Sequence, residues 1–335
     1  MAIVVALSMA ACKTPASNKS TSTSAEATDS LTIAFGSCND VKNPNLLWDD
    51  IVAKNPSQWL WLGDNVYGSE SDLNSFAVNY TKLLADSGYR QLQKVAATDG
   101  IWDDGEFGKN NGGADYIYKD STKNMLLNFL QVPDTDSRRK RGGVYFSKTL
   151  QHKELSVKMI FLDTRYFRDT LIYQKDSIVP NPTGDMLGAA QWEWLASELK
   201  NNPTDLTIIV SGIQVLATGH RFEKWSNFPA SKEKLFQLLG KYTPPKMCFI
   251  SGDRHIGEIS ATSIKSLPYQ LIDVTSSSLT NPWSKPRPEA NIYRKGQLVY
   301  PVNFGLISIR KKSGVTNVTV SLEGNNGQQY TAISF

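Results

Sequence analysis

The sequence predicts an α/β protein in which one or two packed sheets are flanked by helices. Short apolar runs rich in Ile, Val, Leu, Phe and Trp recur along the chain and have the length of buried strands. Between them lie segments with apolar residues at three- and four-residue spacing, as in amphipathic helices. Strands that alternate with helices indicate sheets whose outer faces are covered by helices.

The first twelve residues resemble a bacterial lipoprotein signal. Residues 2–11 (AIVVALSMAA) form an apolar run too short to span a bilayer as a mature helix, and small residues precede Cys12. No Lys or Arg precedes the run, and the alternative is an ordinary frayed N-terminus. We expect a signal segment over residues 1–12, a lipid anchor on Cys12, and an exported protein of the bacterial cell envelope, periplasmic or in the outer membrane.

Residues 13–30 predict a disordered tether, because nine of these eighteen residues are Ser or Thr and almost none is apolar. The rest of the chain, 31–335, shows no shift in composition and is interpreted as one domain. The net charge is +4, from 36 basic and 32 acidic residues, which is too mild to indicate a nucleic acid as partner.

The predicted elements follow in chain order. Strands are expected in the apolar beginnings of LTIAFGSCND (31–40), WLWLGDNVYG (59–68), GIWDDGEFG (100–108), VKMIFLDTRYF (157–167), LTIIVSGIQVL (206–216), MCFISGDRH (247–255) and YQLIDVTSSS (269–278). Helices are expected over 73–95, 189–200 and 232–242.

Polar residues follow closely on several of these apolar runs. They are Cys38, Asp64, Asp103, Asp163 and Asp253. In open α/β sheets, ligands collect outside the carboxyl ends of the strands, so these side chains are expected in one crevice. Each alone could cap a helix or stabilise a turn, but acids gathered in one place need a compensating charge.

Three motifs at these ends carry the chemistry of metal ligands. Oxygen ligands suit calcium, magnesium or manganese, whereas imidazole, thiolate and phenolate suit iron or zinc, so unlike metals are expected. The motifs are GDNVY with Asp64 and Tyr67, SGDRH with Asp253 and His255, and WDDGEFGKNN with Asp103, Asp104 and Asn110.

Six segments, taken in order, resemble the alkaline phosphatase D (PhoD-like) metallophosphatases of the calcineurin-like phosphoesterase superfamily. The segments are GSC, WLGDNVYG, GIWDDGEFGKNNGG, DTRYFRD, SGDRH and TSSSLTNPW. The resemblance covers nearly all of 31–335. It implies a four-layer αββα sandwich of two mixed sheets flanked by helices. It also implies hydrolysis of phosphate monoesters, phosphodiesters or both at a multinuclear site of Fe(3+) and Ca(2+), with other divalent metals as alternatives.

The resemblance also assigns ligands position by position. The ferric ion would be bound by Cys38, Asp64, Tyr67 and His255. Asp64 would bridge to calcium, whose other ligands would be Asp103, Asn110 and Asp253. For Cys38 the alternative is a small buried residue at a strand end, and a disulfide between Cys38 and Cys248 also stays open.

Four residues are candidates for catalytic roles: His255, Arg254, Arg165 and His220. His255 sits beside an acid at a strand end, which favours a ligand or acid/base role. The two arginines could clamp phosphate, since a guanidinium matches it with two hydrogen bonds, or could be ordinary ion-pair residues. His220 could line the pocket with Glu223 and Trp225, or be structural.

One position departs from the family pattern. Between Asp104 and Glu106, PhoD-like sequences usually carry a histidine that assists the transferring phosphoryl group or its leaving group, whereas this chain has Gly105. A histidine restored there is expected to raise turnover. Gly105 also keeps a catalytically weak phosphate- or metal-binding protein open as an alternative. The anchor keeps open a phospholipase-like phosphodiesterase that acts on membrane lipids.

Overall fold

The computed structural model describes residues 1–3, 29–200, 202–283 and 289–335. The signal segment and tether expected from the sequence fall almost wholly in 4–28, outside the described residues. Among the described helices, none has both the length and the apolar character needed to cross a bilayer.

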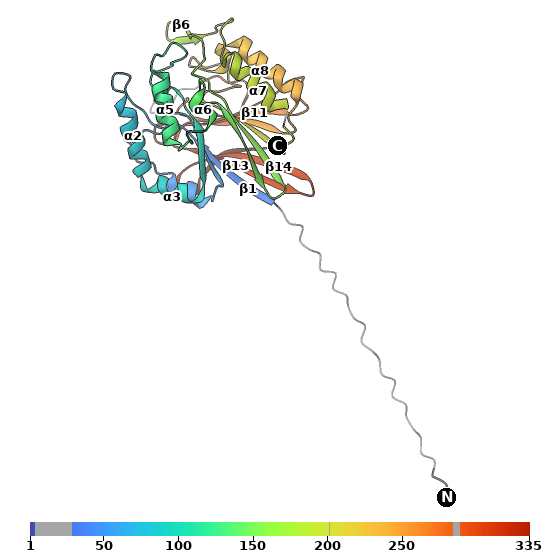
Figure 1. Ribbon diagram of the computed structural model, residues 1–335. Helices are drawn as coiled ribbons and strands as arrows, with labels where there is room; N and C mark the ends of the chain where they lie inside the picture. Colours follow the sequence, from blue (N-terminus) through green and yellow to red (C-terminus); the bar gives the residue numbers. More distant parts are fainter. Residues whose placement is uncertain (4–28, 201, 284–288) are drawn as a thin grey trace.

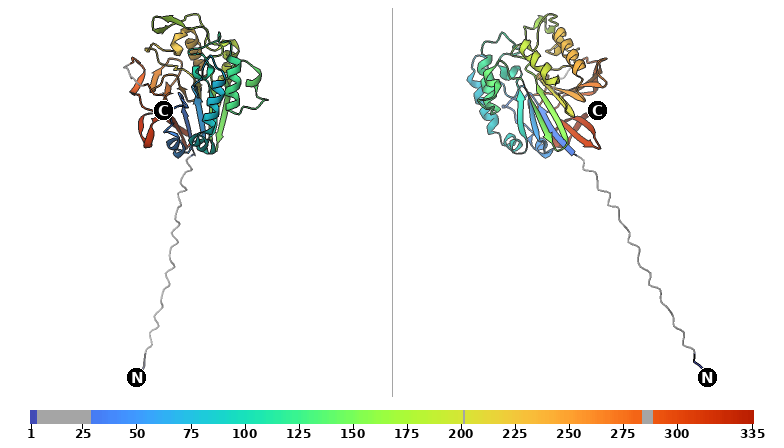
Figure 2. Two further views of the ribbon diagram at one scale, coloured as in Figure 1. Left: turned by 90° about the vertical axis from the view of Figure 1, so that its left-hand side faces the viewer. Right: turned by 45° about the vertical axis from the view of Figure 1, so that its right-hand side comes forward.

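Two sheets pack face to face between two layers of helices, which confirms the predicted four-layer αββα architecture (Figures 1 and 2). In spatial order, the six-stranded sheet contains β15 (Gln329–Ser334), β14 (Val315–Glu323), β13 (Phe304–Lys312), β1 (Asp29–Gly36), β2 (Gln58–Leu62) and β3 (Ala97–Ile101). The seven-stranded sheet contains β12 (Arg294–Val299), β10 (Gly257–Ser263), β11 (Gln270–Ser276), β9 (Met247–Ser251), β8 (Leu206–Ser211), β5 (Leu155–Phe161) and β4 (Phe146–His152).

The helices divide between the two outer faces. The six-stranded sheet is covered by α1 (Trp48–Ala53), α2 (Asn74–Ala85), α3 (Ser87–Val95) and α5 (Lys119–Phe129), and the seven-stranded sheet by α7 (Gly188–Lys200) and α8 (Pro229–Tyr242). The short helices α4 (Asp104–Phe107) and α6 (Ser137–Lys140), the 3-10 turns η1 (Trp225–Asn227) and η2 (Asn325–Gly327), and the hairpin of β6 (Ile172–Gln174) and β7 (Ser177–Val179) lie in the connections.

Strand β2 shows why both faces of a sheet are apolar here. Its sequence, QWLWL, is buried throughout. Leu60 and Leu62 belong to the core between the two sheets, whereas Trp59 and Trp61 belong to the layer under the helices. Because successive side chains of a strand point to opposite faces, a continuous apolar run buries two layers at once.

All seven predicted strands are present, but one predicted helix is divided. The segment 73–95 forms α2 and α3, which meet at Asp86. The carboxylate of Asp86 accepts a hydrogen bond from Tyr89 N at 2.8 Å and caps α3, so the chain starts a new helix there. The antiparallel strands β13, β14 and β15 were not predicted. They extend the first sheet, because β13 pairs with β1 on one side and with β14 on the other.

The parallel strands point their carboxyl ends to one edge of the sandwich. In one sheet β1, β2 and β3 are parallel neighbours, and in the other β5, β8, β9 and β11 are. The segments that follow β1, β2, β3 and β9 therefore come from both sheets and meet at this edge. The site is built there.

Candidate metal centre

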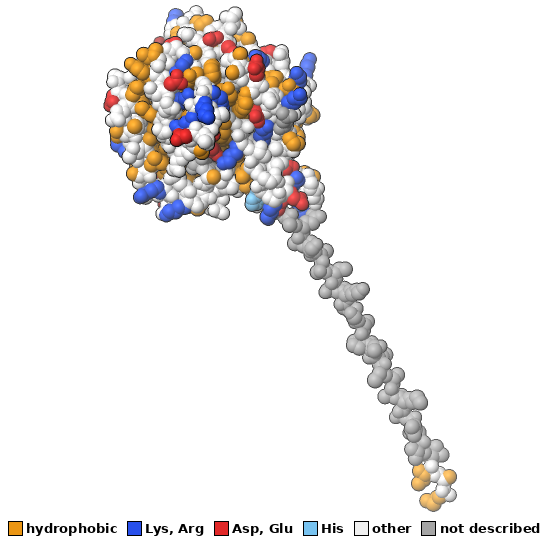
Figure 3. Space-filling model, in the orientation of Figure 1, with side chains coloured by type: hydrophobic (Ala, Val, Ile, Leu, Met, Phe, Trp, Pro, Cys, Tyr) orange, Lys and Arg blue, Asp and Glu red, His pale blue; other side chains and the backbone are white. Residues whose placement is uncertain are grey.

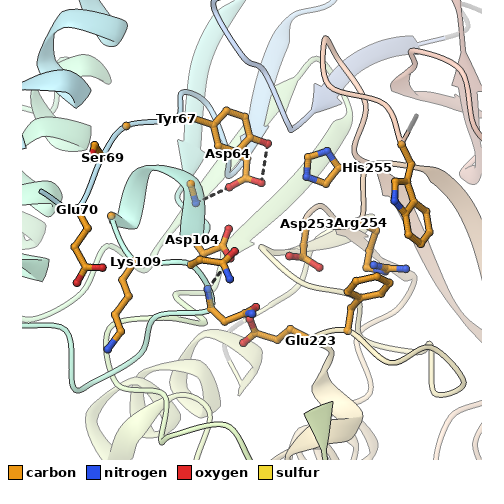
Figure 4. Close-up of a pocket in the computed structure, with 17 residues that line it drawn as sticks. Asp64, Tyr67, Ser69, Glu70, Asp104, Lys109, Glu223, Asp253, Arg254 and His255 are labelled. Carbon is orange, nitrogen blue, oxygen red and sulfur yellow. Dashed lines mark hydrogen bonds between the residues drawn. The ribbon is translucent and has the colours of Figure 1, made fainter. Parts of the chain in front are cut away.

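A cavity of about 660 Å³ opens at the carboxyl edge of the sheets (Figure 4). Asp64, Asp104, Asp253 and His255 project into it from three connections, which follow β2, β3 and β9. The remaining lining residues are Tyr67, Gly68, Ser69, Glu70, Gly105, Gly108, Lys109, Asn110, Asn111, Phe222, Glu223, Arg254 and Trp283.

Four of the strand-end residues adopt left-handed backbone conformations that non-glycine residues rarely take. The φ angles are 58° for Cys38, 51° for Asp64, 72° for Asp253 and 54° for His255. Each such residue costs of order 1–3 kcal/mol, so the surrounding structure must hold it there. This clustering of unfavourable conformations in one pocket is typical of a functional site.

Gly63 explains how two of the strand ends come so close. Its φ is 96°, and a Cβ atom at this position would lie 2.4 Å from both the Cβ and the backbone N of Asp103. Only glycine fits both the angle and the space. The turn after β2 therefore packs directly on the turn after β3, which brings Asp64 against the acidic segment that begins at Asp103.

The side chains of Cys38, Tyr67 and His255 gather around one oxygen of Asp64. Asp64 Oδ2 lies 3.3 Å from Cys38 Sγ and accepts a hydrogen bond from the Tyr67 hydroxyl at 3.1 Å. Ligand atoms of Cys38, Asp64 and His255 all lie within 4.8 Å of one another. The structure thus brings together the four residues that the resemblance assigns to the ferric ion.

His255 is oriented by its backbone surroundings. Its Nδ1 contacts the carbonyl oxygen of Asn281 at 2.5 Å, and its backbone N donates to Ser277 Oγ at 2.8 Å. A ring whose Nδ1–H donates to a carbonyl keeps a lone pair on Nε2. This is the usual arrangement of a metal-binding histidine, in which the second nitrogen fixes the ring.

Asp64 belongs to a second group as well. Ligand oxygens of Asp64, Asp103 and Asp104 lie within 4.8 Å of one another. The backbone N of Gly105 donates to Asp64 Oδ1 at 2.8 Å, and that of Asn111 donates to Asp104 Oδ2 at 2.8 Å. One carboxylate thus lies between a group that contains sulfur and nitrogen and a group that contains only oxygen.

The two neighbouring aspartates differ in where they point. Asp104 lines the cavity, whereas Asp103 is fully buried and accepts a hydrogen bond from Arg165 Nε at 2.8 Å through Oδ1. Asp103 Oδ2 is buried and has no hydrogen-bond partner among the described residues. Asp253 lines the cavity from the opposite side, and Asn110 is an exposed residue at its rim.

Burial and mutual repulsion oppose the charged forms of these acids. Burial, with the nearby Cys38 and acidic groups, raises the pKa of Asp64 well above its usual range. Burial, with the charges of Asp103 and Asp104, does the same to the pKa of Asp253. Burial raises the pKa of Asp103 to about 7, although Arg165 opposes this shift.

The softer groups are also disfavoured as anions. Burial raises the pKa of the Cys38 thiol to about 11 and the pKa of the Tyr67 phenol well above its usual value. A cation would reverse these shifts by favouring carboxylate, thiolate and phenolate together. The donor set therefore fits bound cations, with thiolate, phenolate and imidazole on one side of Asp64 and oxygens on the other.

Below the cavity, a chain of buried ion pairs ties the acidic segment to its neighbours. Arg165 Nη1 contacts Glu223 at 2.5 Å, and Arg168 Nε contacts the other oxygen of Glu223 at 3.0 Å. Arg168 Nη2 also donates to the carbonyl oxygens of Asn111 and Gly112. Arg165, a predicted phosphate clamp, does not line the cavity and is instead part of this support.

Of the other two catalytic candidates, Arg254 is part of the cavity wall and His220 is not. Arg254 lines the cavity and pairs with Glu289 at 2.5 Å. His220 is only 7% exposed and lies behind Phe222, with ring centroids 6.3 Å apart, and does not line the cavity. Burial and the positive charge of Arg254 lower the pKa of His220 well below its usual value.

Two further predictions concerned a disulfide between Cys38 and Cys248 and a place for Asp163 in the crevice. Cys38 and Cys248 are both buried free thiols, and Cys248 lies in the core between the sheets. Asp163 follows its strand as predicted but turns away from the cavity. Its carboxylate accepts hydrogen bonds from Trp102 Nε1 at 2.9 Å and from Val144 N at 2.8 Å, which anchors two connections.

Several residues of the site were not among the predicted ligands or catalytic groups. Asp104 is the clearest: it was quoted in the motif, but its orientation depends on Asp103 beginning α4 as its N-cap. Phe222 and Trp283 line the cavity, yet nothing in their spacing distinguishes them from core aromatics. Arg168 sits three residues after Arg165 in DTRYFRD, a spacing that could have flagged the pair.

Comparison with known proteins agrees with this geometry. Residues 148–301 match the model of the PhoD-like phosphatase family. A solved structure described as PhoD is similar with a TM-score of 0.71 and 13% identity, over 91% of this chain and 69% of the other. A dimetal phosphatase from Danio rerio is similar with a TM-score of 0.54 and 12% identity, over 91% and 98% of the two chains. No curated protein matches significantly. Together, the matched segment, the four-layer fold and the motifs gathered at its carboxyl edge make this chain similar to the PhoD-like phosphatase family.

Proposed function

We propose that this chain is a metal-dependent hydrolase of phosphate monoesters, phosphodiesters or both. The observation that carries the proposal is the position of Asp64, whose carboxylate belongs to two ligand groups at once. A carboxylate shared in this way can hold two cations close together, as in two-metal sites for phosphoryl transfer. The match of residues 148–301 to the PhoD-like phosphatase family and the likeness to a dimetal phosphatase support the same reaction class.

The two groups favour different ions. Thiolate and phenolate from Cys38 and Tyr67, with imidazole from His255, stabilise a ferric ion. On the other side of Asp64, oxygen atoms favour a hard divalent ion, for which calcium is the proposal. Asp104 offers a cavity-facing oxygen there, and Asp103 has one free buried oxygen. Asp253 faces this group across the cavity, and Asn110 can add an amide oxygen from the rim.

When bound, the cations would polarise the phosphoryl group and supply the nucleophilic water or hydroxide. The chain's own contribution is binding and orientation. Arg254 places a guanidinium on the cavity wall between two ligand residues, where it can bind a phosphoryl oxygen. Glu223 closes the floor of the cavity, with both oxygens engaged by buried arginines. His255 is held in one ring orientation by the carbonyl of Asn281.

The test is the isosteric substitution Asp64→Asn. It should remove both metal ions and hydrolysis of 4-nitrophenyl phosphate and bis(4-nitrophenyl) phosphate, because the amide cannot bridge two cations. Asp176→Asn is the matched control, since Asp176 is an exposed acid outside the cavity. Elemental analysis and steady-state kinetics give the readout. A metal-free protein that hydrolyses both esters at the full rate would refute the site. A wild-type protein that binds metal but hydrolyses neither ester would favour the alternative of a catalytically weak phosphate- or metal-binding protein.

We also propose that the protein is exported and anchored through an acylated Cys12. The support is the apolar run before Cys12 and the Ser/Thr-rich segment after it. Since one acyl chain gives only marginal anchoring, firm attachment needs more than one chain. Cys12→Ser should move the protein from the membrane fraction to the soluble fraction. Equal membrane association of both forms would rule the anchor out.

The position of the domain's first strand favours soluble esters over membrane lipids. Asp29 begins β1 (Figure 1). Gly36 ends this strand two residues before Cys38, whose Sγ lies 3.3 Å from the cavity-lining Asp64, so the cavity lies at the end of β1 opposite Asp29. Eight residues of strand span roughly 25 Å. An anchor beyond Asp29 would attach at the pole opposite the cavity. Comparison of soluble esters with phospholipid vesicles as substrates separates this proposal from the phospholipase-like alternative.

A further inference from the structure

One wall of the cavity is formed by aromatic side chains that metal binding does not need. Phe222 and Trp283 both line the cavity, and both side chains are half-buried. Their rings meet edge to face, with centroids 5.4 Å apart and planes at 74°. The opposite wall, in contrast, carries Ser69, Glu70 and Lys109. An ester held at the metal centre therefore meets one aromatic and one polar wall.

A cation is built into the aromatic wall. The guanidinium carbon of Arg254 lies 4.4 Å from the centroid of Phe222 and 5.8 Å from that of Trp283. The pair with Glu289 holds this guanidinium from the other side. Arg254 is 4% exposed, so the wall is a packed unit and not a set of mobile surface side chains.

The wall is also fixed relative to the metal ligands. Arg254 lies in the chain between Asp253 and His255, two of the candidate ligands. The backbone N of Trp283 donates to the carbonyl oxygen of His255 at 3.0 Å. Phe222 precedes Glu223, which is held by the buried arginines below the cavity. Both aromatic residues are thus connected through the backbone to residues of the site.

The size of the cavity shows that more than a phosphoryl group fits. About 660 Å³ is in the range of pockets that enclose a drug-sized organic molecule. Half-buried large aromatic rings in a pocket otherwise lined mainly by charged and polar residues are suited to a flat apolar partner. A polyol or short alkyl group would leave them in contact with water.

We propose that Phe222 and Trp283 are specificity-determining residues that bind a planar aromatic ring on the organic group of the ester. This inference rests on the proposed phosphoesterase function and adds its substrate class, of which nucleotides are the representative. Stacking of a base on an aromatic side chain is worth roughly a 5- to 150-fold change in affinity. Arg254 serves the phosphoryl group, while the rings beside it hold the aromatic group.

The experiment compares adenosine 5′-phosphate with ribose 5-phosphate. Both release the same type of primary alcohol, so the difference between them is the base. The wild-type protein should have a roughly 5- to 150-fold higher kcat/KM for the nucleotide. Trp283→Leu should remove most of this preference for the nucleotide over ribose 5-phosphate, while Trp283→Phe should retain part of it. For a strict diesterase, the methyl esters of the same pair are used.

The matched control is Tyr118→Leu, which removes an exposed aromatic ring outside the cavity and should leave the ratio unchanged. Binding of benzylphosphonate against cyclohexylmethylphosphonate, measured by calorimetry, tests stacking without turnover and reports whether a simple aryl group suffices. No turnover on any ester by metal-loaded protein overturns the proposed function. Turnover with equal kcat/KM for both esters, or equal affinity for both phosphonates, overturns the aromatic subsite alone.

Discussion

Replacing Gly105 with alanine should weaken metal binding, because the new methyl group would displace the shared ligand. A Cβ atom at this position would lie 2.6 Å from Asp64 Oδ1 and 2.9 Å from two ring carbons of Tyr67. Ordinary contact begins near 3.4 Å, so Asp64 Oδ1 must retreat by about 0.8 Å if Gly105 stays in place. Metal–ligand distances tolerate changes of about 0.2 Å.

The expected result is a loss of metal affinity by roughly 10- to 100-fold, the range seen when the surroundings of a ligand are disturbed. Folding itself should not suffer. Gly105 lies in α4 and is not among the residues with positive φ, and alanine favours a helix over glycine by up to about 1 kcal/mol. The variant should therefore fold, bind metal weakly and turn over slowly at limiting metal.

Competition with a chelator of known affinity, followed by elemental analysis, measures the effect. Gly240→Ala is the control: its Cβ would lie 2.4 Å from the Cβ of Ser266, which is crowding of the same degree away from the cavity. It should lower stability and leave metal affinity unchanged. If Gly105→Ala binds both ions as tightly as the wild type, the close packing of Gly105 on Asp64 is not what positions that ligand.

The same packing argues against the expectation that a restored histidine raises turnover. Gly105→His adds the same Cβ atom and a ring beyond it, so Asp64 and Tyr67 must move before the imidazole can assist any leaving group. We therefore expect Gly105→His to be no more active than Gly105→Ala at equal metal content. A histidine variant that exceeds the wild type would show that the loop repacks around the ring.

Three further outcomes are expected. Arg168→Met should lower the free energy of unfolding by about 3–5 kcal/mol in urea, because the buried Glu223 loses one of its two arginines and the carbonyl groups of Asn111 and Gly112 lose their donor. Adding Glu223→Gln should recover part of this loss, and no recovery would contradict the pairing of Arg168 with Glu223. The metal-free protein should lose stability as pH rises from about 4 to 7, because burial raises the pKa of Asp103 to about 7 and the folded state therefore keeps that proton to a higher pH than the unfolded state. Unfolding curves in which stability rises over this pH range would refute the raised pKa. Chelation should lower stability by about 2.7 kcal/mol when the free metal had been at 100 times its Kd, measured as a shift in thermal unfolding, and no shift would mean that the metal does not bind the folded chain preferentially.

Much of this protein follows from local sequence. The seven apolar runs predict seven strands because burial on both faces requires a continuous apolar segment, and QWLWL at 58–62 shows this directly. The motif endings predict the site because the carboxyl ends of parallel strands share an edge of the sheet. The family resemblance added the assignment of Cys38, Asp64, Tyr67 and His255 to one centre before their distances were known.

The tertiary structure alone decided which neighbouring side chains face the cavity. Asp103 and Asp104 are adjacent and identical, yet Asp103 is turned inward to Arg165 and Asp104 outward to the cavity. Arg165 and Arg254 look alike in sequence, but one lies below the site and the other in its wall. The physical reason is that strand endings fix where the backbone goes, whereas the direction of a side chain depends on charges and contacts that arrive from distant segments. Gly105 is the clearest example of what the local sequence could not predict. A Cβ atom at this position would lie 2.6 Å from Asp64 Oδ1, and this distance depends on the packing of two segments 41 residues apart.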